Sequence, residues 1–404
     1  MPESNASETP KLRIVGVSTS YPLRHDSTAG LFVHRLYREL SPTFEVAVIC
    51  PADSTDGYDR ENHSVMVSPV KYAPRRLRVL GGAGGIIPAI RSAQWKVLLL
   101  PALLSGMFIS VLKHGQSVDL IHANWAICGT LAGLAGRLLR KPVVTTLRGD
   151  DVTRASHSML DRFFLSCAVR WSQKIVCVSE PMAERLSLAF PQRASDIHAC
   201  LNGVDESFFN VVKRDLSESL SLRIVCVGSL IPRKAYATLV RAVALCGARK
   251  QIHVRLIGDG PSRGELESLC RSLGVADQFE FLGERSPEQI RQVFAESDMF
   301  ALPSRSEGRP NALIEAIAAG LPAVSTNLDG VRGLVFPEMN GWLFAVDDAD
   351  GLAEILDSAF QRKPDLSAMG ETGRIALSTR GGWERTACCY AHVFNAVLGS
   401  EVSR

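Results

Sequence analysis

The stretch PSRSEGRPNALIEAIAAGLP, residues 303–322, contains two carboxylates in different local settings. Glu307 stands among turn residues, whereas Glu315 stands inside a helical pattern. A carboxylate accepts hydrogen bonds, and the vicinal hydroxyls of a sugar or ribose are suitable donors. The pair is therefore a candidate for holding ligand hydroxyls, although each glutamate alone could equally be a surface charge.

The same stretch carries the signals of a helix start and a helix end. Pro310 suits the first helical position, and Gly320 followed by Pro322 suits the stop. The start of such a helix presents free N–H groups and the positive end of the helix dipole. The sequence predicts an anion site there, beside Glu307.

Two adjacent cations follow another predicted strand, residues 222–228. In GSLIPRKA, Arg233 and Lys234 stand just beyond the carboxyl end of that strand. An arginine and a lysine together suit a phosphate or pyrophosphate. The alternative is that these two cations are solvated charges at a helix start. We favour ligand binding because the two cations occur together with the two glutamates.

A glycine-rich turn follows the predicted strand 253–258. Gly258 and Gly260 in GDGPSRGELE would let a flat group such as a nucleotide base approach the backbone closely. A simple turn explains these two glycines as well.

Short apolar runs alternate with helical patterns along the whole chain. Such strands, separated by helices, predict parallel sheets covered on both faces. There are two sets, so the predicted fold class is α/β with two doubly wound, Rossmann-like domains. The predicted strands are 12–17, 44–50, 118–123, 142–147 and 174–179 in the first set, and 222–228, 253–258, 279–283, 299–303 and 322–326 in the second.

The predicted domain boundaries follow from these two sets and from the polar segment between them. An N-terminal domain of residues 1–205 is joined by a linker, 206–221, to a C-terminal domain of residues 222–380. Residues 381–404 are expected to form a C-terminal helix that packs toward the N-terminal domain.

Composition and missing motifs narrow the function classes. A net charge of +3 over 404 residues gives no indication of nucleic-acid binding. The dinucleotide fingerprint, the P-loop and the zinc and serine-hydrolase motifs do not occur, and no metal site is expected. The ten cysteines show no CxxC spacing, which favours buried, reduced thiols in a cytoplasmic protein. The polar N-terminus is not expected to be a signal peptide.

The order of several motifs resembles a known family. SxxEGxPNALxEAxAxGLPxVxT, together with VGSLIPRKA, IGDGPSRGELE, FLGERSPEQIRQVFAESDMFALPS and NGWLF, is similar to the donor site of retaining GT-B glycosyltransferases. IHANW, KPVVTTLRGDDV, VCVSEPMAERL and LNGVDESFF extend the resemblance through the first half. Bacterial polysaccharide and lipopolysaccharide transferases and phosphatidylinositol mannosyltransferases belong to that family. Its GT-B fold implies two domains facing each other across a cleft.

The resemblance implies a role for each of the four charged residues. Arg233 and Lys234 would bind the pyrophosphate of a nucleotide diphosphate sugar. Glu307 would bind hydroxyls of the transferred sugar, and Glu315 those of the ribose. Glu307, Lys234 and Arg148 would lie nearest the chemistry.

The remaining implied donor contacts are glycines and the loop that enters the 310–320 helix. The loop at Gly258 and Gly260 would lie near the base, and Gly30 would belong to a glycine loop facing the donor across the cleft. The backbone that would line the phosphates comprises Gly308, Pro310, Asn311 and Ala312.

The chain departs from the family pattern at Arg148 and Gly333. Arg148 stands where members commonly have a histidine that contacts the donor, and Gly333 where they often have a glutamate. Arginine is permanently charged and cannot act as a general base, but it could clamp a phosphate or an acidic sugar.

The implied reaction is metal-independent transfer of a sugar, with retention, to a hydroxyl of a glycan or lipid-linked acceptor. It needs no cofactor beyond the nucleotide sugar, and cell-surface polysaccharide or glycolipid synthesis is the implied pathway. A sugar-nucleotide epimerase or hydrolase of the same fold, and a non-catalytic sugar-nucleotide-binding protein, are the alternatives.

A basic, apolar window lies in the first half. Residues 62–118 contain no Asp or Glu, and residues 71–113 combine cations with the run VLLLPALLSGMFISVL. This segment is expected either to contact an anionic membrane surface from the cytoplasmic side or to be a core helix. The run is 16 residues long and contains Pro101, so it is short for a membrane span.

Overall fold

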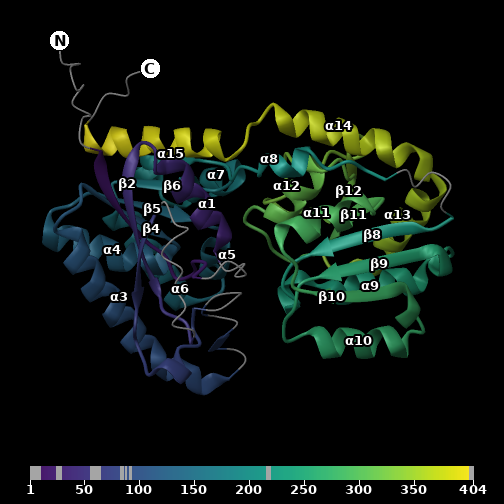
Figure 1. The fold of residues 1–404 in the computed structure, drawn as a ribbon, viewed down its shortest axis with the longest axis horizontal. Coiled ribbons are helices and arrows are strands. Elements are labelled where there is room, and N and C mark those ends of the chain that lie inside the picture. The colour runs from purple at the N-terminus through teal and green to yellow at the C-terminus, as the bar shows by residue number, and fades with distance from the viewer. Residues whose placement is uncertain are drawn as a thin grey trace, which may run out of the picture. The chain divides into compact units, whose positions relative to one another are not determined.

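The computed structural model describes residues 11–23, 30–54, 65–81, 86, 89–90, 93–214 and 220–399. Part of the predicted linker (215–219), of the basic window (82–85, 87–88 and 91–92) and of the C-terminal helix (400–404) lies outside these ranges. The chain forms two compact units (Figure 1). The first unit comprises Met1–Cys177, Leu186–Cys200 and Ala387–Arg404, and the second comprises Val178–Arg185 and Leu201–Thr386.

The first unit is built on a seven-stranded parallel sheet with the order β3-β2-β1-β4-β5-β6-β7. Every residue of β4 and of β5 is buried, as expected for strands covered by helices on both faces. The strands are β1 Leu12–Val17, β2 Phe44–Pro51, β3 Met66–Val70, β4 Leu120–Asn124, β5 Val143–Leu147, β6 Lys174–Cys177 and β7 Ile197–Ala199.

Helices cover this sheet, and one of them comes from the end of the chain. In α15 (Trp383–Leu398), Phe394 packs edge-on against Phe44 of β2, and Tyr390 bonds Thr146 of β5. The other helices of this half of the sequence are α1 Leu31–Leu40, α3 Leu100–Gly115, α4 Ala126–Leu139, α5 Asp150–Ala155, α6 Met159–Trp171 and α7 Glu180–Ala189.

The second unit contains a six-stranded parallel sheet with the order β10-β9-β8-β11-β12-β13. Its strands are β8 Leu222–Val227, β9 Ile252–Ile257, β10 Phe279–Gly283, β11 Met299–Leu302, β12 Ala323–Thr326 and β13 Gly341–Phe344. Its helices are α8 Glu206–Phe209, α9 Tyr236–Leu245, α10 Arg263–Ser272, α11 Pro287–Ala295, α12 Asn311–Ala318, α13 Ala349–Gln361 and α14 Leu366–Ser378.

These two sheets confirm the prediction of two doubly wound α/β units. All ten predicted strands form, and three further strands, β3, β7 and β13, were not predicted. β3 lies at the edge of its sheet and contains Pro69, which has no N–H to donate and weakens the sequence signal of a strand. β7 and β13 are only three and four residues long.

The prediction that all ten cysteines are reduced is wrong. Cys200, next to β7, and Cys389, in α15, form a disulfide within the first unit. The pairing joins residues 189 positions apart, so no sequence spacing could indicate it. Among the free cysteines, Cys388 is exposed and the rest are buried.

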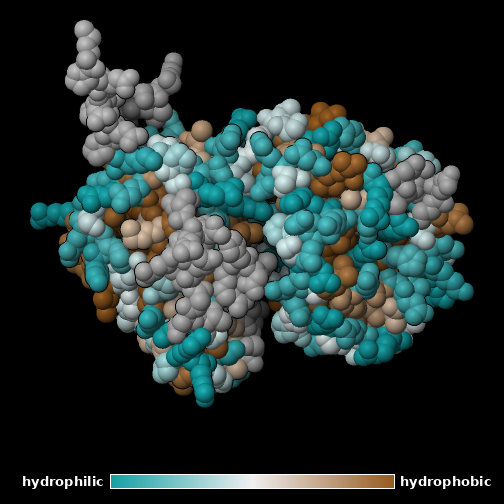
Figure 2. Space-filling view, in the orientation of Figure 1, coloured by the Kyte–Doolittle hydropathy of each residue, from teal (hydrophilic) through white to brown (hydrophobic). Residues whose placement is uncertain are grey.

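The apolar run of the first half is a helix that is partly packed and partly exposed. The continuous helical segment Gln94–Gly115 is long and apolar enough to cross a membrane, by length and composition alone. However, Leu103, Met107 and Val111 of α3 are buried in the core of the first unit. Leu98 and Ile109, by contrast, are 77% and 64% exposed. Figure 2 shows hydrophobic surface beside hydrophilic surface on this unit.

His122 of β4 lies at the centre of a buried polar network in the first unit. Its Nδ1 is 2.9 Å from the hydroxyl of Tyr37, and its Nε2 is 2.8 Å from Oγ1 of Thr146. Burial, with a further contribution from Arg148, lowers the pKa of His122 to about 3. The imidazole is therefore neutral in the folded protein at neutral pH.

This low pKa predicts an acid-sensitive fold. The unfolded chain binds a proton at His122 near pH 6.5, whereas the folded chain does so only near pH 3. Stability from this group is therefore lost as the pH falls through this window, at about 1.4 kcal/mol per pH unit. Urea unfolding of the wild type and of His122→Gln tests this. The wild type should lose stability more steeply between about pH 6 and pH 4, and parallel pH profiles would contradict the assignment.

Candidate functional site

The predicted cations and Glu307 follow two neighbouring strands at the switch point of the second sheet. The strand order runs from β8 through β9 to β10 on one side and from β11 through β12 to β13 on the other. In doubly wound sheets the loops at the carboxyl ends of strands around such a point form the ligand site. Arg233 and Lys234 lie in a 3₁₀ turn, Pro232–Lys234, after β8, and Glu307 lies in the loop after β11.

Hydrogen bonds join these two loops directly. Arg233 Nη1 donates to the Ser306 carbonyl at 2.8 Å, and the Arg305 amide donates to the Arg233 carbonyl at 2.9 Å. Arg305 also reaches the carbonyl of Pro232 at 3.1 Å and pairs with Asp347 at 2.8 Å. The backbone that carries the cations and the backbone that carries Glu307 are thus held together.

Glu307 forms a buried ion pair with Lys234. Lys234 Nζ donates to Glu307 Oε1 at 2.7 Å, and the Ser304 hydroxyl donates to the same oxygen at 2.7 Å. Arg233 Nη1 lies 3.5 Å from Oε2. The side chains of Glu307 and Lys234 are only 7% and 13% exposed. The sequence analysis brought these residues to one site but did not predict that they pair. Ser304 is the first residue of the motif SxxEGxPNALxEAxAxGLPxVxT, but the sequence analysis assigned it no role.

The cations keep Glu307 ionised. Burial alone would raise the pKa of its carboxyl, but Lys234, Arg233 and the hydrogen bonds from Lys234 and Ser304 more than compensate, so the pKa is lowered. Arg309 adds a further, half-buried cation in the loop between Glu307 and α12. Burial and the nearby Arg380 lower the pKa of Arg309 to about 10, and it remains protonated at neutral pH.

Helix α12 begins one residue later than predicted. Pro310 is the N-cap, with ψ of 99°, and Asn311 is the first helical residue. The Pro310 carbonyl accepts from the amides of Leu313 and Ile314, and the Asn311 side chain accepts from Asn202 at 3.0 Å.

The other predicted residues of this stretch lie around the helix start. Gly308 is in the entering loop, Ala312 is in the first turn of α12, and Glu315 begins the second turn, half-buried. The roles of Gly308, Ala312 and Glu315 in ligand binding stay predictions.

Gly258 and Gly260 are required by loop packing. A Cβ on Gly258 would lie 2.2 Å from the Gly228 carbonyl oxygen, and one on Gly260 would lie 2.5 Å from that of Leu230. Gly258 also has φ of +126°, which side chains rarely adopt. The structure therefore explains both glycines by the approach of the neighbouring backbone, and a contact with a base stays a prediction.

The two remaining predicted residues, Arg148 and Gly30, belong to the first unit. Arg148 follows β5; its Nη2 donates to Asn124 Oδ1 at 2.6 Å, and its guanidinium lies 4.9 Å from the ring centre of Phe32. Gly30 is the N-cap of α1, and a Cβ there would lie 2.2 Å from the Ser20 carbonyl oxygen. Arg148 is thus held in place by contacts from β4 and α1.

Asp151 is a positioning residue that sequence reasoning missed. Its buried carboxylate accepts from the backbone amides of Arg148, Gly149 and Val152 through one oxygen and from that of Ala126 through the other. The carboxylate therefore ties the turn after β5 to the first residue of α4. The two acidic residues directly after Arg148–Gly149 in the sequence could have indicated a carboxylate that holds this turn.

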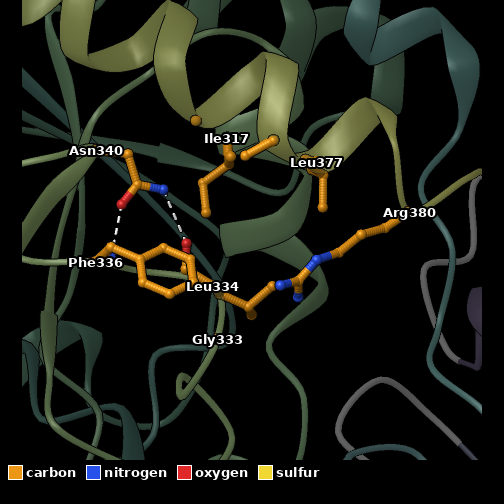
Figure 3. A pocket seen from close by; sticks show the side chains of 9 residues that line it. Ile317, Gly333, Leu334, Phe336, Asn340, Leu377 and Arg380 are labelled. Carbon is orange, nitrogen blue, oxygen red and sulfur yellow. Dashed lines mark hydrogen bonds between the residues drawn. The ribbon is translucent and has the colours of Figure 1, made fainter.

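A small pocket in the second unit is a separate feature (Figure 3). It is lined by Ile317 of α12, by the end of α14 and by Arg380, and its volume is about 20 Å³. Asn340 braces one wall by accepting from the Phe336 amide at 2.7 Å and donating to the Leu334 carbonyl at 2.9 Å (Figure 3). A volume of this size holds about one water molecule, so the pocket cannot take a sugar nucleotide.

The buried pair predicts strong coupling between Lys234 and Glu307. Removing one partner leaves an uncompensated buried charge, so Lys234→Met and Glu307→Gln should each lower the free energy of unfolding, by up to about 3 kcal/mol. The double variant should lose less than the sum, with a coupling of about 1–3 kcal/mol. Chemical denaturation of all four proteins measures this, and additive losses would show that the two groups do not interact.

Two family models cover most of the chain. The model described as Glycosyltransferase Family 4 matches residues 29–208, and the model described as Glycosyl transferases group 1 matches residues 213–376. The GDP-mannose-dependent alpha-(1-6)-phosphatidylinositol monomannoside mannosyltransferase of Mycobacterium tuberculosis is 29% identical over 363 residues, which is 82% of this chain and 90% of that protein.

Solved structures show the same architecture over nearly the whole chain. Sucrose-phosphate synthase from Thermosynechococcus elongatus superposes with a TM-score of 0.78 at 20% identity, covering 96% of this chain and all of that one. HepE from Anabaena, solved in complex with UDP-glucose, gives a TM-score of 0.74 at 20% identity, covering 95% of this chain and all of that one. The fold is therefore GT-B, and the chain belongs to the group 1 and family 4 glycosyltransferases.

Proposed function

We propose that this glycosyltransferase moves a sugar, with retention of configuration, from a nucleotide diphosphate sugar to a hydroxyl of a glycan or lipid-linked acceptor. The observation that carries the proposal is the buried pair of Glu307 and Lys234, with the half-buried Arg233 beside it, in the loops near the start of α12. The cluster combines cations for a diphosphate with a carboxylate for sugar hydroxyls. The M. tuberculosis relative is named for GDP-mannose, and HepE was solved with UDP-glucose, which supports a nucleotide-sugar donor.

The proposed chemistry needs charge stabilisation more than a strong base. As the bond from the anomeric carbon to the diphosphate breaks, negative charge grows on the leaving phosphate. Lys234, Arg233 and the N-terminus of α12 would stabilise that charge without a metal ion. The acceptor oxygen would bond to the anomeric carbon on the same face, and its proton would pass to the leaving phosphate.

The other predicted residues have supporting roles in this proposal. Glu307 would hold the hydroxyls of the transferred sugar and Glu315 those of the ribose. Arg148, fixed by Asn124, would contact a phosphate or an acidic sugar, and Gly30 would allow the donor to approach the first unit. The donor would otherwise meet backbone at Gly258, Gly260, Gly308, Pro310, Asn311 and Ala312.

Cell-surface polysaccharide or glycolipid synthesis is the proposed setting. The putative TuaC glycosyltransferase of Bacillus subtilis, 27% identical over 365 residues, is named for teichuronic acid biosynthesis, and the M. tuberculosis relative for a phosphatidylinositol mannoside. A hydrolase or epimerase of the same fold would consume the donor without an acceptor, and a non-catalytic binding protein would not consume it.

A donor screen and one substitution test the function. Thermal-shift measurements with UDP-, GDP- and ADP-sugars should identify a donor, because a bound ligand stabilises the fold by mass action. Glu307→Gln should then lose at least about a hundredfold in transfer while binding the nucleoside diphosphate at least as tightly, since both cations are released from the carboxylate. Lys234→Met is the matched comparison and should weaken diphosphate binding. Tight donor binding with no turnover under any acceptor would contradict the enzyme assignment.

We also propose that the basic window of residues 71–113 contacts anionic membrane lipids. Arg75 and Arg76 are exposed, and the neighbouring helical segment exposes Trp95, Leu98 and Ile109. Cations beside exposed apolar side chains suit the surface of an anionic bilayer. This contact would bring the enzyme to a lipid-linked acceptor.

Flotation with vesicles containing an anionic phospholipid tests the membrane contact. Replacing Arg75, Arg76 and Arg78 by Glu should reduce the bound fraction severalfold, because each cation near such a surface contributes about 1 kcal/mol. Three exposed cations of the second unit, Arg249, Lys250 and Arg271, provide a control with the same change in net charge. Equal flotation of the two triple variants would rule out a contact specific to the basic window.

A further inference from the structure

Tyr236 is a buried residue at the site whose hydroxyl has no assigned partner. It is the first residue of α9, two positions after Lys234, and only 3% of it is exposed. Its Oη finds no hydrogen-bond partner among the residues that the structure describes. A buried hydroxyl without a partner is unfavourable, and such groups are rare in folded proteins.

This hydroxyl and the Lys234 ammonium flank the same glycine. A Cβ added to Gly228, at the end of β8, would lie 3.0 Å from Tyr236 Oη, 3.2 Å from Lys234 Cε and 3.5 Å from Lys234 Nζ. The phenol and the ammonium therefore both lie close to Gly228, at the carboxyl end of β8. That is the edge of the sheet where Glu307 and α12 also lie.

Both groups can donate hydrogen bonds at this point. The ammonium carries three hydrogens, and within the described residues its one recorded acceptor is Glu307. Burial, with smaller contributions from Cys226 and Glu307 that outweigh Arg233, raises the pKa of Tyr236 well above its ordinary value. The phenol therefore stays protonated and can donate a hydrogen bond.

We propose that the Tyr236 hydroxyl is a phosphate-binding group of this site, donating a hydrogen bond to an oxygen of the donor diphosphate beside Lys234. The inference rests on the proposed function, because that function supplies the diphosphate. An anionic oxygen is the acceptor that best suits a neutral phenol next to an ammonium group. In the unliganded protein the buried hydroxyl destabilises the fold, because it has lost its hydrogen bonds to water without gaining another. A bound phosphate oxygen would supply the missing acceptor.

Tyr236→Phe separates a binding role from a packing role, because it removes only the hydroxyl. The unliganded variant should unfold at the same temperature as the wild type or at a higher one. The reason is that the substitution removes a buried hydroxyl that destabilises the fold by having no partner. Calorimetric affinity for the nucleoside diphosphate that the donor screen selects should fall about ten- to a hundredfold, as for a hydrogen bond to a charged group. Affinity for the corresponding nucleoside, which lacks phosphates, should not change.

Tyr390→Phe is the matched control. Tyr390 is equally buried, but its hydroxyl bonds Thr146 Oγ1 at 3.2 Å in the first unit. Its loss should lower the unfolding temperature and leave diphosphate affinity unchanged. Equal diphosphate affinities of the wild type and Tyr236→Phe would overturn the inference, whatever the stabilities, and leave the proposed function standing. A wild type that binds no nucleoside diphosphate would overturn both.

Discussion

The buried pair between Lys234 and Glu307 is the interaction on which the rest of the site depends. A carboxylate that is 7% exposed remains ionised only if cations or hydrogen-bond donors compensate for its loss of hydration. Lys234 and Arg233 supply that compensation, and the hydrogen bonds between the two loops hold them within reach. In the proposed function the same two cations would bind the diphosphate, and the unliganded protein already holds both beside Glu307.

The fold explains why these groups meet although they are about seventy residues apart in sequence. β8 and β11 are neighbours in the sheet, and their carboxyl ends open at the same edge. Gly258 and Gly260 let the next loop pack closely against Gly228–Leu230, which fixes the backbone around the cations. In the first unit Asp151 likewise fixes the turn that carries Arg148, by accepting hydrogen bonds from the amides of Arg148 and Gly149.

Much of this could be predicted from the sequence, and the rest depended on tertiary contacts. Apolar runs such as LRIVCV and MFAL identified strands because buried parallel strands are apolar on both faces. Their order then placed Arg233, Lys234 and Glu307 at strand ends. Sequence patterns carry no information on which side chains pair across loops, so the Lys234–Glu307 bond, the Ser304 contact and the Cys200–Cys389 disulfide were not foreseen. The role proposed for Tyr236 was not foreseen either, since a tyrosine at a helix start is usually a packing residue.

A crystal structure of the protein with the bound nucleoside diphosphate tests the central claim most directly. The diphosphate should lie at the start of α12, with Lys234 Nζ within hydrogen-bond distance of a phosphate oxygen and the Glu307 carboxylate turned toward the position of the sugar. A diphosphate bound elsewhere on the chain, with Lys234 and Glu307 still paired only to each other, would contradict it.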